Sequence, residues 1–435
     1  ANLFATKKLI VYIDVIRCSC KQNYCSSLRK GTIMRLLRLS ITGVSLYESD
    51  KLNLDLYATD RVLSSDIGLE DVCRFDSGNA IYSQNVIGIS GVNASGKTTT
   101  LNLLRFVLSQ LTGSYSMRGF KVPANGLGKV SDVLTLQAVF WHEGDYYLID
   151  STLKRDGALP DLAPFEVALS YAFADESIWR YGRRRVNRAT IADPAAFKDG
   201  SKLLYCRGAA SGEIGYISED VRLVLGEHRS IASLVTKKVS IVVEAPERSL
   251  PAITMPTKVV QAFDGSVEGL AWDSDSQVFR LKFKGEPERV VGMEAAVSML
   301  SRGTVYGAEL VDHAIEVLSV GGYFIVDEIE ESLNRALVAV IIDLFSSPVT
   351  NPHGAQMVFS THYPELLDCL NRKDCVYVLT RNSDFRTKVV KYSDVVNRIE
   401  NKKSEAILSN LIKGSMPKYS DVQGLREYVK ERVNG

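Results

Sequence analysis

GVNASGKT, residues 91–98, is the stretch of sequence that decides the fold. It matches the pattern GxxxxGK[ST], in which glycines let the backbone curl so that successive N–H groups point at phosphate oxygens. The apolar residues before it, 85–90 (NVIGIS), predict a short buried strand, and residues 98–110 (TTTLNLLRFVLSQ) have the apolar spacing of a helix. A helix that begins beside such a loop adds positive potential for phosphate.

This loop supplies most of the candidate ligand contacts. We expect Lys97 to reach the β- and γ-phosphates of ATP, and the Thr98 hydroxyl to ligate Mg²⁺. ATP and Mg²⁺ are therefore the predicted ligands. The predicted nucleotide-binding residues of the loop are Gly91, Asn93, Ser95, Gly96, Lys97, Thr98 and Thr99.

A second motif, residues 321–328 (GGYFIVDE), predicts an apolar strand that ends in two carboxylates. Asp327 is expected to hold Mg²⁺ through water, and Glu328 to act as the general base that polarises the attacking water. A core strand capped by two solvated acids is the alternative for this pattern taken alone. The catalytic interpretation is favoured because the phosphate-loop pattern accompanies it.

Two shorter motifs complete the set. LSRGT precedes a predicted helix, which places the Ser301 side chain and the Gly303 N–H at a helix N-terminus suited to phosphate, although an ordinary helix cap is the alternative. His362 follows the predicted strand 356–360 and is expected to sense the γ-phosphate. A lone histidine is more often a packed or surface residue, but its place in the strand order favours the catalytic role.

Strands and helices alternate in the second half of the chain. Apolar spacing predicts strands at 323–326 and 356–360, and helices at 293–300, 307–318, 332–345 and after Pro364. This order is typical of a parallel sheet covered by helices. Nearer the N-terminus, two β-rich runs surround the sequence HEGD at 142–145 and predict a hairpin.

The composition is that of a globular protein with a full core: 435 residues, 46% hydrophobic and 24% charged. The net charge of +1 gives no reason to expect global attraction to nucleic acid or to an anionic membrane. No run of apolar residues is long enough to predict a transmembrane helix, and the apolar residues 9–16 lack a signal-peptide cleavage site, so no membrane partner is expected. Seven scattered cysteines without a CxxC pair argue against zinc and favour the cytoplasm.

Taken together, GVNASGKTT, LSRGT, YFIVDEIEESLN and VFSTHYPELLD resemble the motifs of ABC-type P-loop ATPases related to the OLD and SMC-like proteins. More narrowly, the chain resembles the stand-alone ATPases of bacterial abortive-infection and anti-phage systems, such as those of the PARIS and Septu types. The resemblance covers roughly residue 34 to the C-terminus, and AFDGSVEGL and RKDCVYVLTRN are similar to stretches found in that group.

The resemblance implies an α/β fold, with an ABC-type P-loop head, a β-rich lobe and an inserted mixed lobe. The expected divisions are an N-terminal extension or gene-start artefact at 1–33, the first part of the head at 34–150, the inserted lobe at 151–255, the second part of the head at 256–403 and a helical tail at 404–435.

The resemblance also implies a head-to-tail homodimer or higher oligomer. Ser301 and Gly303 of one subunit would then close over ATP held by the phosphate loop of another. The chain departs from the family pattern at three positions, with Ala94 for a glycine, Arg302 for a small residue and Asn334 for a frequent histidine. These departures affect the expected rate of ATP hydrolysis more than the expected binding of ATP. Gln137 is the candidate for the lid glutamine that usually contacts Mg²⁺.

No effector domain is evident in the sequence. Only 73 residues follow His362, too few for the nuclease domain of OLD-type proteins, and the DxD of Asp273 and Asp275 predicts a solvated turn. Asp327 lies 230 positions after Lys97, a longer spacing than in transporter ATPases. The segment between them is too short and too poor in heptads for SMC-type coiled-coil arms.

Our first hypothesis is an ATPase sensor or scaffold of an anti-phage defence system. It would control a separately encoded effector, such as a nuclease or toxin, after detecting a phage component. The alternatives are a DNA-repair or chromosome-associated SMC-like ATPase that binds DNA directly, and an ATP-binding structural subunit with negligible turnover. The densest basic patch, around Arg183, Arg184 and Arg185, would suit nucleic-acid phosphates, but a solvated face or a dock for an acidic partner is equally compatible.

Overall fold

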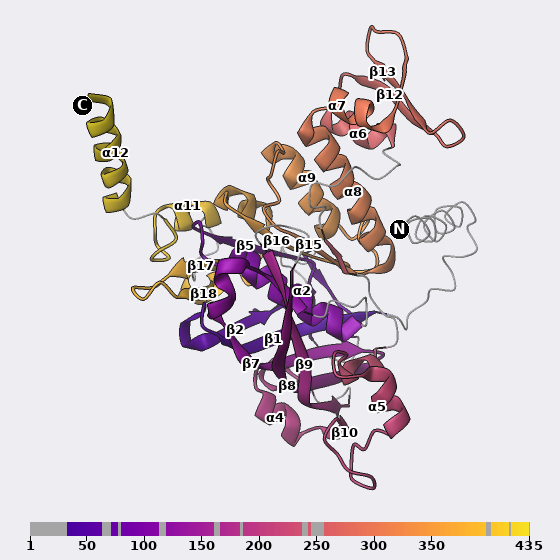
Figure 1. Ribbon diagram of the computed structural model, residues 1–435, viewed down its shortest axis with the longest axis vertical. Coiled ribbons are helices and arrows are strands. Elements are labelled where there is room, and N and C mark those ends of the chain that lie inside the picture. The colour runs from indigo at the N-terminus through magenta and orange to yellow at the C-terminus, as the bar shows by residue number, and fades with distance from the viewer. Residues whose placement is uncertain are drawn as a thin grey trace.

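A computed structural model describes residues 33–62, 71–76, 80–112, 119–160, 166–182, 186–236, 242–244, 256–396, 402–416 and 419–434. These residues form a mixed α/β fold with several sheets (Figure 1). The proposed N-terminal extension, apart from residue 33, lies outside them. Arg183, Arg184 and Arg185 of the basic patch also lie outside the described residues.

The candidate site is built on a six-stranded sheet with the strand order β11-β15-β16-β5-β17-β18. The first five strands are parallel and β18 is antiparallel to β17. Every residue of β15, β16 and β5 is buried, as their apolar sequences predicted. The strands of this sheet are β5 (Val86–Gly91), β11 (Val242–Glu244), β15 (Tyr323–Val326), β16 (Gln356–Thr361), β17 (Val376–Arg381) and β18 (Thr387–Lys391).

Each face of this sheet has its own hydrophobic core. Alternate strand residues point to opposite faces, so Ile87 and Ile89 of β5 join one core while Val86 joins the other. Helix α2 (Lys97–Thr112) covers the first face. The second face is covered by α8 (Arg302–Val320) and α9 (Arg335–Ser346), which lie together on the same side in Figure 1.

A seven-stranded antiparallel sheet packs on the α2 side and shares its core. Its β7 and β8 are joined by a two-residue turn at Glu143 and Gly144, which have φ values of 49° and 95°, so the hairpin predicted at 142–145 is confirmed. The strands are β1 (Met34–Val44), β2 (Lys51–Asp55), β6 (Gly119–Pro123), β7 (Val130–His142), β8 (Asp145–Pro160), β9 (Glu166–Tyr181) and β10 (Lys202–Cys206).

This sheet crosses one of the predicted domain boundaries. Residue 150 lies inside β8, which pairs with β7 on one side and β9 on the other, so the first strands of the predicted inserted lobe belong to the same sheet as β1. A lobe of short helices follows β9, formed by α3 (Arg188–Ala192), α4 (Pro194–Asp199), α5 (Glu219–Leu225) and η4 (Ile231–Leu234). The boundary predicted at 403/404 similarly falls inside α11 (Lys403–Leu408).

A smaller unit with its own core lies beside α8. Asp273 Oδ1 accepts hydrogen bonds from the backbone N–H groups of Asp275 and Ser276, which confirms the predicted turn. The unit consists of α6 (Thr257–Phe263), β12 (Val267–Asp273), β13 (Val278–Phe283), β14 (Arg289–Val291) and α7 (Met293–Met299). The remaining elements are η1 (Glu48–Asp50), β3 (Val72–Cys73), β4 (Ser83–Gln84), η3 (Ala124–Lys129), η5 (Pro364–Cys369), α10 (Tyr392–Val395) and α12 (Tyr419–Asn434).

None of the helices in the described ranges is both long and apolar enough to cross a membrane.

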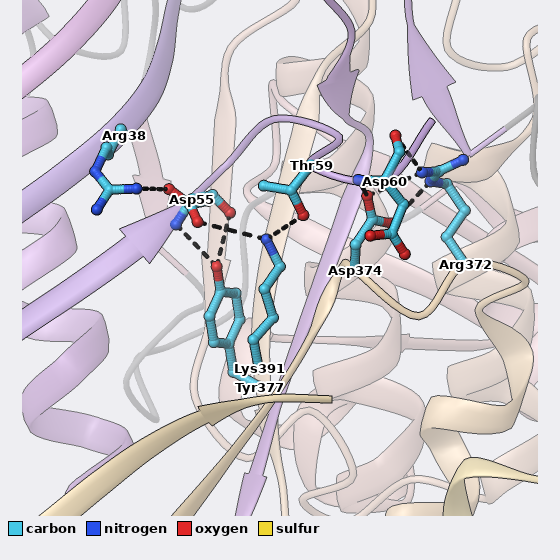
Figure 2. A network of polar contacts seen from close by, with 8 residues as sticks. All are labelled: Arg38, Asp55, Thr59, Asp60, Arg372, Asp374, Tyr377 and Lys391. Carbon is cyan, nitrogen blue, oxygen red and sulfur yellow. Dashed lines mark hydrogen bonds and ion pairs between the residues drawn. The ribbon is translucent and has the colours of Figure 1, made fainter. Parts of the chain in front are cut away.

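Polar side chains connect the two sheets (Figure 2). The Tyr377 hydroxyl, on β17, accepts from the Asp55 N–H (2.8 Å) and donates to the Asp55 carbonyl (3.0 Å). The Asp55 carboxylate also accepts from Arg38 at 2.8 Å, and Lys391 donates to Thr59 at 2.7 Å. Strands β2 and β17, which belong to different sheets, are therefore held together by hydrogen bonds as well as by the shared core.

A buried ion pair lies at the other end of this network. Arg372 donates two hydrogen bonds of 2.9 Å to Asp374, and both side chains are almost fully buried, with 7% and 0% exposure. The Asp60 N–H donates to the same carboxylate at 2.9 Å. Burial raises the pKa of Asp374, but the hydrogen bonds and charge of Arg372 outweigh it and hold that pKa below its ordinary value.

We predict that Arg372→Met lowers the free energy of unfolding by about 3–5 kcal/mol, because it leaves a buried carboxylate without its cation. The measurement is urea unfolding at neutral pH. In the wild type, ionised Asp374 contributes to the free energy of unfolding at pH values above the unfolded carboxyl pKa of about 3.9. This contribution is lost as the pH falls below that value. In Arg372→Met, the free energy of unfolding should no longer show this decrease at acid pH.

The matched control is Arg289→Gln, which breaks the exposed pair with Glu286 (2.7 Å). It should change the free energy of unfolding by no more than about 1 kcal/mol. Equal effects of the two substitutions would contradict a special role for the buried pair.

Candidate active site

Three of the four predicted motifs meet at one edge of the six-stranded sheet. Strands β5, β16 and β15 are consecutive neighbours, and the loop 91–98, His362 and the Asp327–Glu328 pair lie at their carboxyl ends. A cavity of about 930 Å³ opens there, lined by this loop, by Glu328 and by His362. Ligands of open α/β sheets bind at this end of the strands.

The loop 91–98 has the backbone shape of an anion site. Ala94 and Gly96 have φ values of 59° and 95°, and this alternation directs neighbouring N–H groups to one side. Gly91 is required by close packing, since a Cβ there would lie 2.4 Å from the Leu379 carbonyl oxygen of β17. Ala94 has a side chain and still adopts a left-handed conformation, which costs roughly 1–2 kcal/mol in a residue other than glycine.

Strands β17 and β18 hold this loop in place through two residues that the sequence did not single out. The Arg381 guanidinium donates to the Ala94 carbonyl. The buried Thr387 hydroxyl donates to the Ser95 carbonyl at 2.7 Å. Neither contact has a local sequence signal, because each joins the loop to residues near the other end of the chain.

Lys97 is a buried cation with neutral partners. It is 6% exposed, and its ammonium donates to the Gly91 carbonyl at 2.9 Å and to His362 Nδ1 at 3.3 Å. Burial lowers the pKa of Lys97, while the nearby charges of Glu328 and Asp327 raise it. Among the described side chains no carboxylate lies within ion-pair distance of the ammonium, so an anion bound in the loop would offset its desolvation.

The contacts of Lys97 determine the tautomer of His362. An ammonium can only donate, so Nδ1 of His362 accepts and Nε2 carries the hydrogen. That Nε2–H donates to Glu328 Oε1 at 3.1 Å. His362 thus connects the cation of the loop with the acid that follows β15, and the Glu328 side chain is 49% exposed to solvent.

Asp327 and Glu328 are positioned from the neighbouring strand and from α2. Ser360 Oγ accepts from the Glu328 N–H at 2.8 Å and donates to Asp327. The Thr98 hydroxyl donates to the second oxygen of Asp327 at 2.6 Å. Thr98 and Asp327 are therefore adjacent, as two ligands of one Mg²⁺ ion, direct and through water, must be.

Glu330 is a further site residue that sequence reasoning missed. Its carboxylate accepts from the His362 backbone N–H at 2.6 Å, and it lines the cavity. The signal was present in the acid-rich run DEIEE, but only the first two acids followed a strand directly.

Five of the predicted site residues do not line the cavity of their own chain: Gly91, Gln137, Ser301, Gly303 and Asp327. Ser301 caps α8, where its Oγ accepts from the Thr304 N–H at 3.0 Å, so its predicted place at a helix N-terminus is confirmed. Gln137 donates to Asp150 at 3.2 Å within the seven-stranded sheet. Asn93, Ser95, Gly96 and Thr99 do line the cavity, as predicted.

No protein-family model and no curated protein matches this chain.

The cavity fits a nucleotide with its Mg²⁺ ion. Its lining includes the loop with the buried Lys97 ammonium and Thr98, whose hydroxyl donates to Asp327 just outside the lining. Ser95 Oγ also lies in this lining, buried without a hydrogen-bond partner among the described residues. The lining also contains apolar side chains that suit a base and sugar: Val44, Leu46, Val122, Pro123 and Val130.

We predict that Thr387→Val destabilises the protein by about 1–3 kcal/mol, because the isosteric side chain leaves the buried Ser95 carbonyl without its donor. Urea unfolding measures this change. The control is Thr350→Val, which removes an exposed hydroxyl that also donates to a backbone carbonyl, that of Leu344, at 2.7 Å. Water replaces that bond, so a loss as large as that in Thr387→Val would argue against the role of burial.

Proposed function

We propose that this protein is an ABC-type ATPase that binds ATP and Mg²⁺ in the cavity at the end of β5, β16 and β15. The observation that carries the proposal is that Lys97, Thr98, Glu328 and His362 line one cavity, where Thr98 is hydrogen-bonded to Asp327 and His362 to both Lys97 and Glu328. These residues come from three neighbouring parallel strands, and each has the chemistry that phosphoryl transfer needs.

In this proposal, the loop N–H groups and Lys97 bind the phosphates, while Thr98 and Asp327 hold the metal ion. Mg²⁺ supplies the positive charge that neutralises the phosphate oxygens. Glu328 is exposed to solvent and accepts a proton from water as the general base. Its hydrogen bond from His362 Nε2 orients the carboxylate.

A second copy of the chain would complete the site. Ser301 and Arg302 are exposed at the start of α8 and do not line the cavity of their own chain. An N-terminal helix end with exposed N–H groups suits phosphate. We therefore propose a head-to-tail dimer in which this end of α8 closes over the nucleotide of the neighbouring subunit.

The biological role we propose is that of a cytoplasmic sensor or scaffold in an anti-phage defence system, which controls a separate effector protein. It is supported by the family resemblance of the motifs and by the described cysteines, all of which are free, as in a reducing compartment.

We predict that Glu328→Gln retains ATP binding but hydrolyses ATP about 10²–10⁴-fold more slowly, because it lacks the general base. ATP binding is measured by calorimetry and turnover by phosphate release. Light scattering with ATP should show a stable dimer of this variant. Unchanged turnover would assign the base to another residue.

Lys97→Met tests ATP binding, as Glu328→Gln tests hydrolysis. It should lose ATP affinity, yet the nucleotide-free protein should be at least as resistant to urea, because a buried ammonium with a lowered pKa is removed. The stability of the wild type should also rise with pH just below the unfolded lysine pKa of about 10.4, a rise that Lys97→Met lacks. Retained ATP affinity would contradict the assigned loop.

The sensor role predicts that Glu328→Gln, expressed with its neighbouring genes, copurifies with a second protein at a fixed ratio, because ATP trapped in the site preserves the assembly. Mass spectrometry would identify a nuclease or toxin. Lys97→Met is the control and should recover less of the partner. Recovery with DNA instead of a protein would favour the alternative of a DNA-directed ATPase.

A further inference from the structure

The first turn of α8 packs directly against the backbone that follows the catalytic acids of the same chain. A Cβ built on Gly303 would lie 2.4 Å from the carbonyl oxygen of Ser332. The atom in the way belongs to the backbone, so no change of side-chain rotamer can relieve the contact. Gly303 therefore allows an approach that no other residue type permits.

Ser332 is part of a tightly turned segment, residues 328–333, which we call the acid loop. The Glu331 N–H donates to the Glu328 carbonyl at 2.8 Å, and the Leu333 N–H donates to the Glu330 carbonyl at 3.1 Å. Glu328 and Ser332 both have left-handed backbones, with φ values of 48° and 61°. Such strained residues keep their conformation only when their surroundings hold it.

The acid loop positions the chemical groups of the site. It carries Glu328, and its Glu330 accepts the hydrogen bond from the His362 N–H at 2.6 Å. Ser332 itself lines the cavity. A displacement of Ser332 would therefore be transmitted to Glu328 and His362.

A second residue of α8 faces the same loop. Tyr306 lies three positions after Gly303, hence on the same face of the helix. Burial raises the pKa of Tyr306, and the charges of Glu331 and Glu330 raise it further. Tyr306 also packs against the core cluster that contains Ile329 of the acid loop.

We propose that Gly303 is a positioning residue for the acid loop of its own chain, in addition to its place at the phosphate-facing end of α8. The inference rests on the proposed function and deepens it. Because Ser301 on the same helix turn would serve the neighbouring subunit, α8 connects the two nucleotide sites of the dimer. A shift of α8 on closing over one nucleotide would move the acid loop at the other site.

The first experiment needs no nucleotide and tests the contact in the intact chain. Gly303→Ala should make the amides of residues 328–333 exchange with deuterium about tenfold faster, because the loop is pushed out of place. The control is Gly307→Ala, one turn along, whose Cβ would meet the ring of Phe263 on α6, 2.2 Å away. This control should leave exchange in the acid loop unchanged. Unchanged exchange in Gly303→Ala would overturn the proposal.

The second experiment separates the two roles of α8 by mixed dimers, purified through two different tags. In a dimer of Lys97→Met with Ser301→Ala, one site keeps both its own Lys97 and the partner's α8, so about half of the wild-type turnover should remain. In a dimer of Lys97→Met with Gly303→Ala, that site has the same intact components but an acid loop displaced by the added methyl group. Its turnover should fall at least tenfold below the first dimer.

Equal turnover of the two mixed dimers would overturn the proposed action of Gly303 within its own chain. If Gly303→Ala folds poorly, the double variant with Ser332→Gly is used, because glycine relieves the left-handed strain and lets the loop yield. It should recover turnover above Gly303→Ala, and no recovery counts against the proposal. Faster exchange in a protein that hydrolyses no ATP would retain the positioning role while the proposed ATPase function fails.

Discussion

Parallel hydrogen bonding of β15, β16 and β5 is the constraint on which the site depends. Val326 pairs with Phe359, and Thr361 pairs with Ser90, so the three strands end at nearly the same level. This register places Ser360 beside Asp327, where one hydroxyl serves both acids. With β16 between the other two strands, His362 lies between the buried ammonium and the exposed carboxylate.

The loops at these strand ends contain residues that are held in unfavourable backbone conformations. Ala94, Glu328 and Ser332 all have positive φ without being glycine, and all three line the cavity. Hydrogen bonds from elsewhere in the fold offset this strain, as with Arg381 at Ala94 and Ser360 at Glu328. Strain held by its surroundings is common where groups must be preorganised for chemistry.

Burial of Lys97, like the backbone strain, lowers the stability of the fold at a site that is suited to a function. A desolvated ammonium among carbonyl groups destabilises the folded chain, but it makes a strong site for an anion. The rest of the fold is well packed, because both faces of the six-stranded sheet have cores. The buried pair of Arg372 and Asp374 also makes hydrogen bonds to the backbone of Asp60, after β2. The acid loop is supported in turn by α8.

The sequence by itself determined the local units of this protein. β5, the glycine-rich loop and α2 follow from adjacent residues, and so do the strand before Asp327 and the turn at Glu143–Gly144, because apolar periodicity and turn chemistry act over a few residues. Only the tertiary structure decided which strands are neighbours, how far β8 continues, and that Arg381, Thr387 and Glu330 support the site. Those contacts join residues far apart in the chain, and no local pattern encodes a partner that only folding brings near.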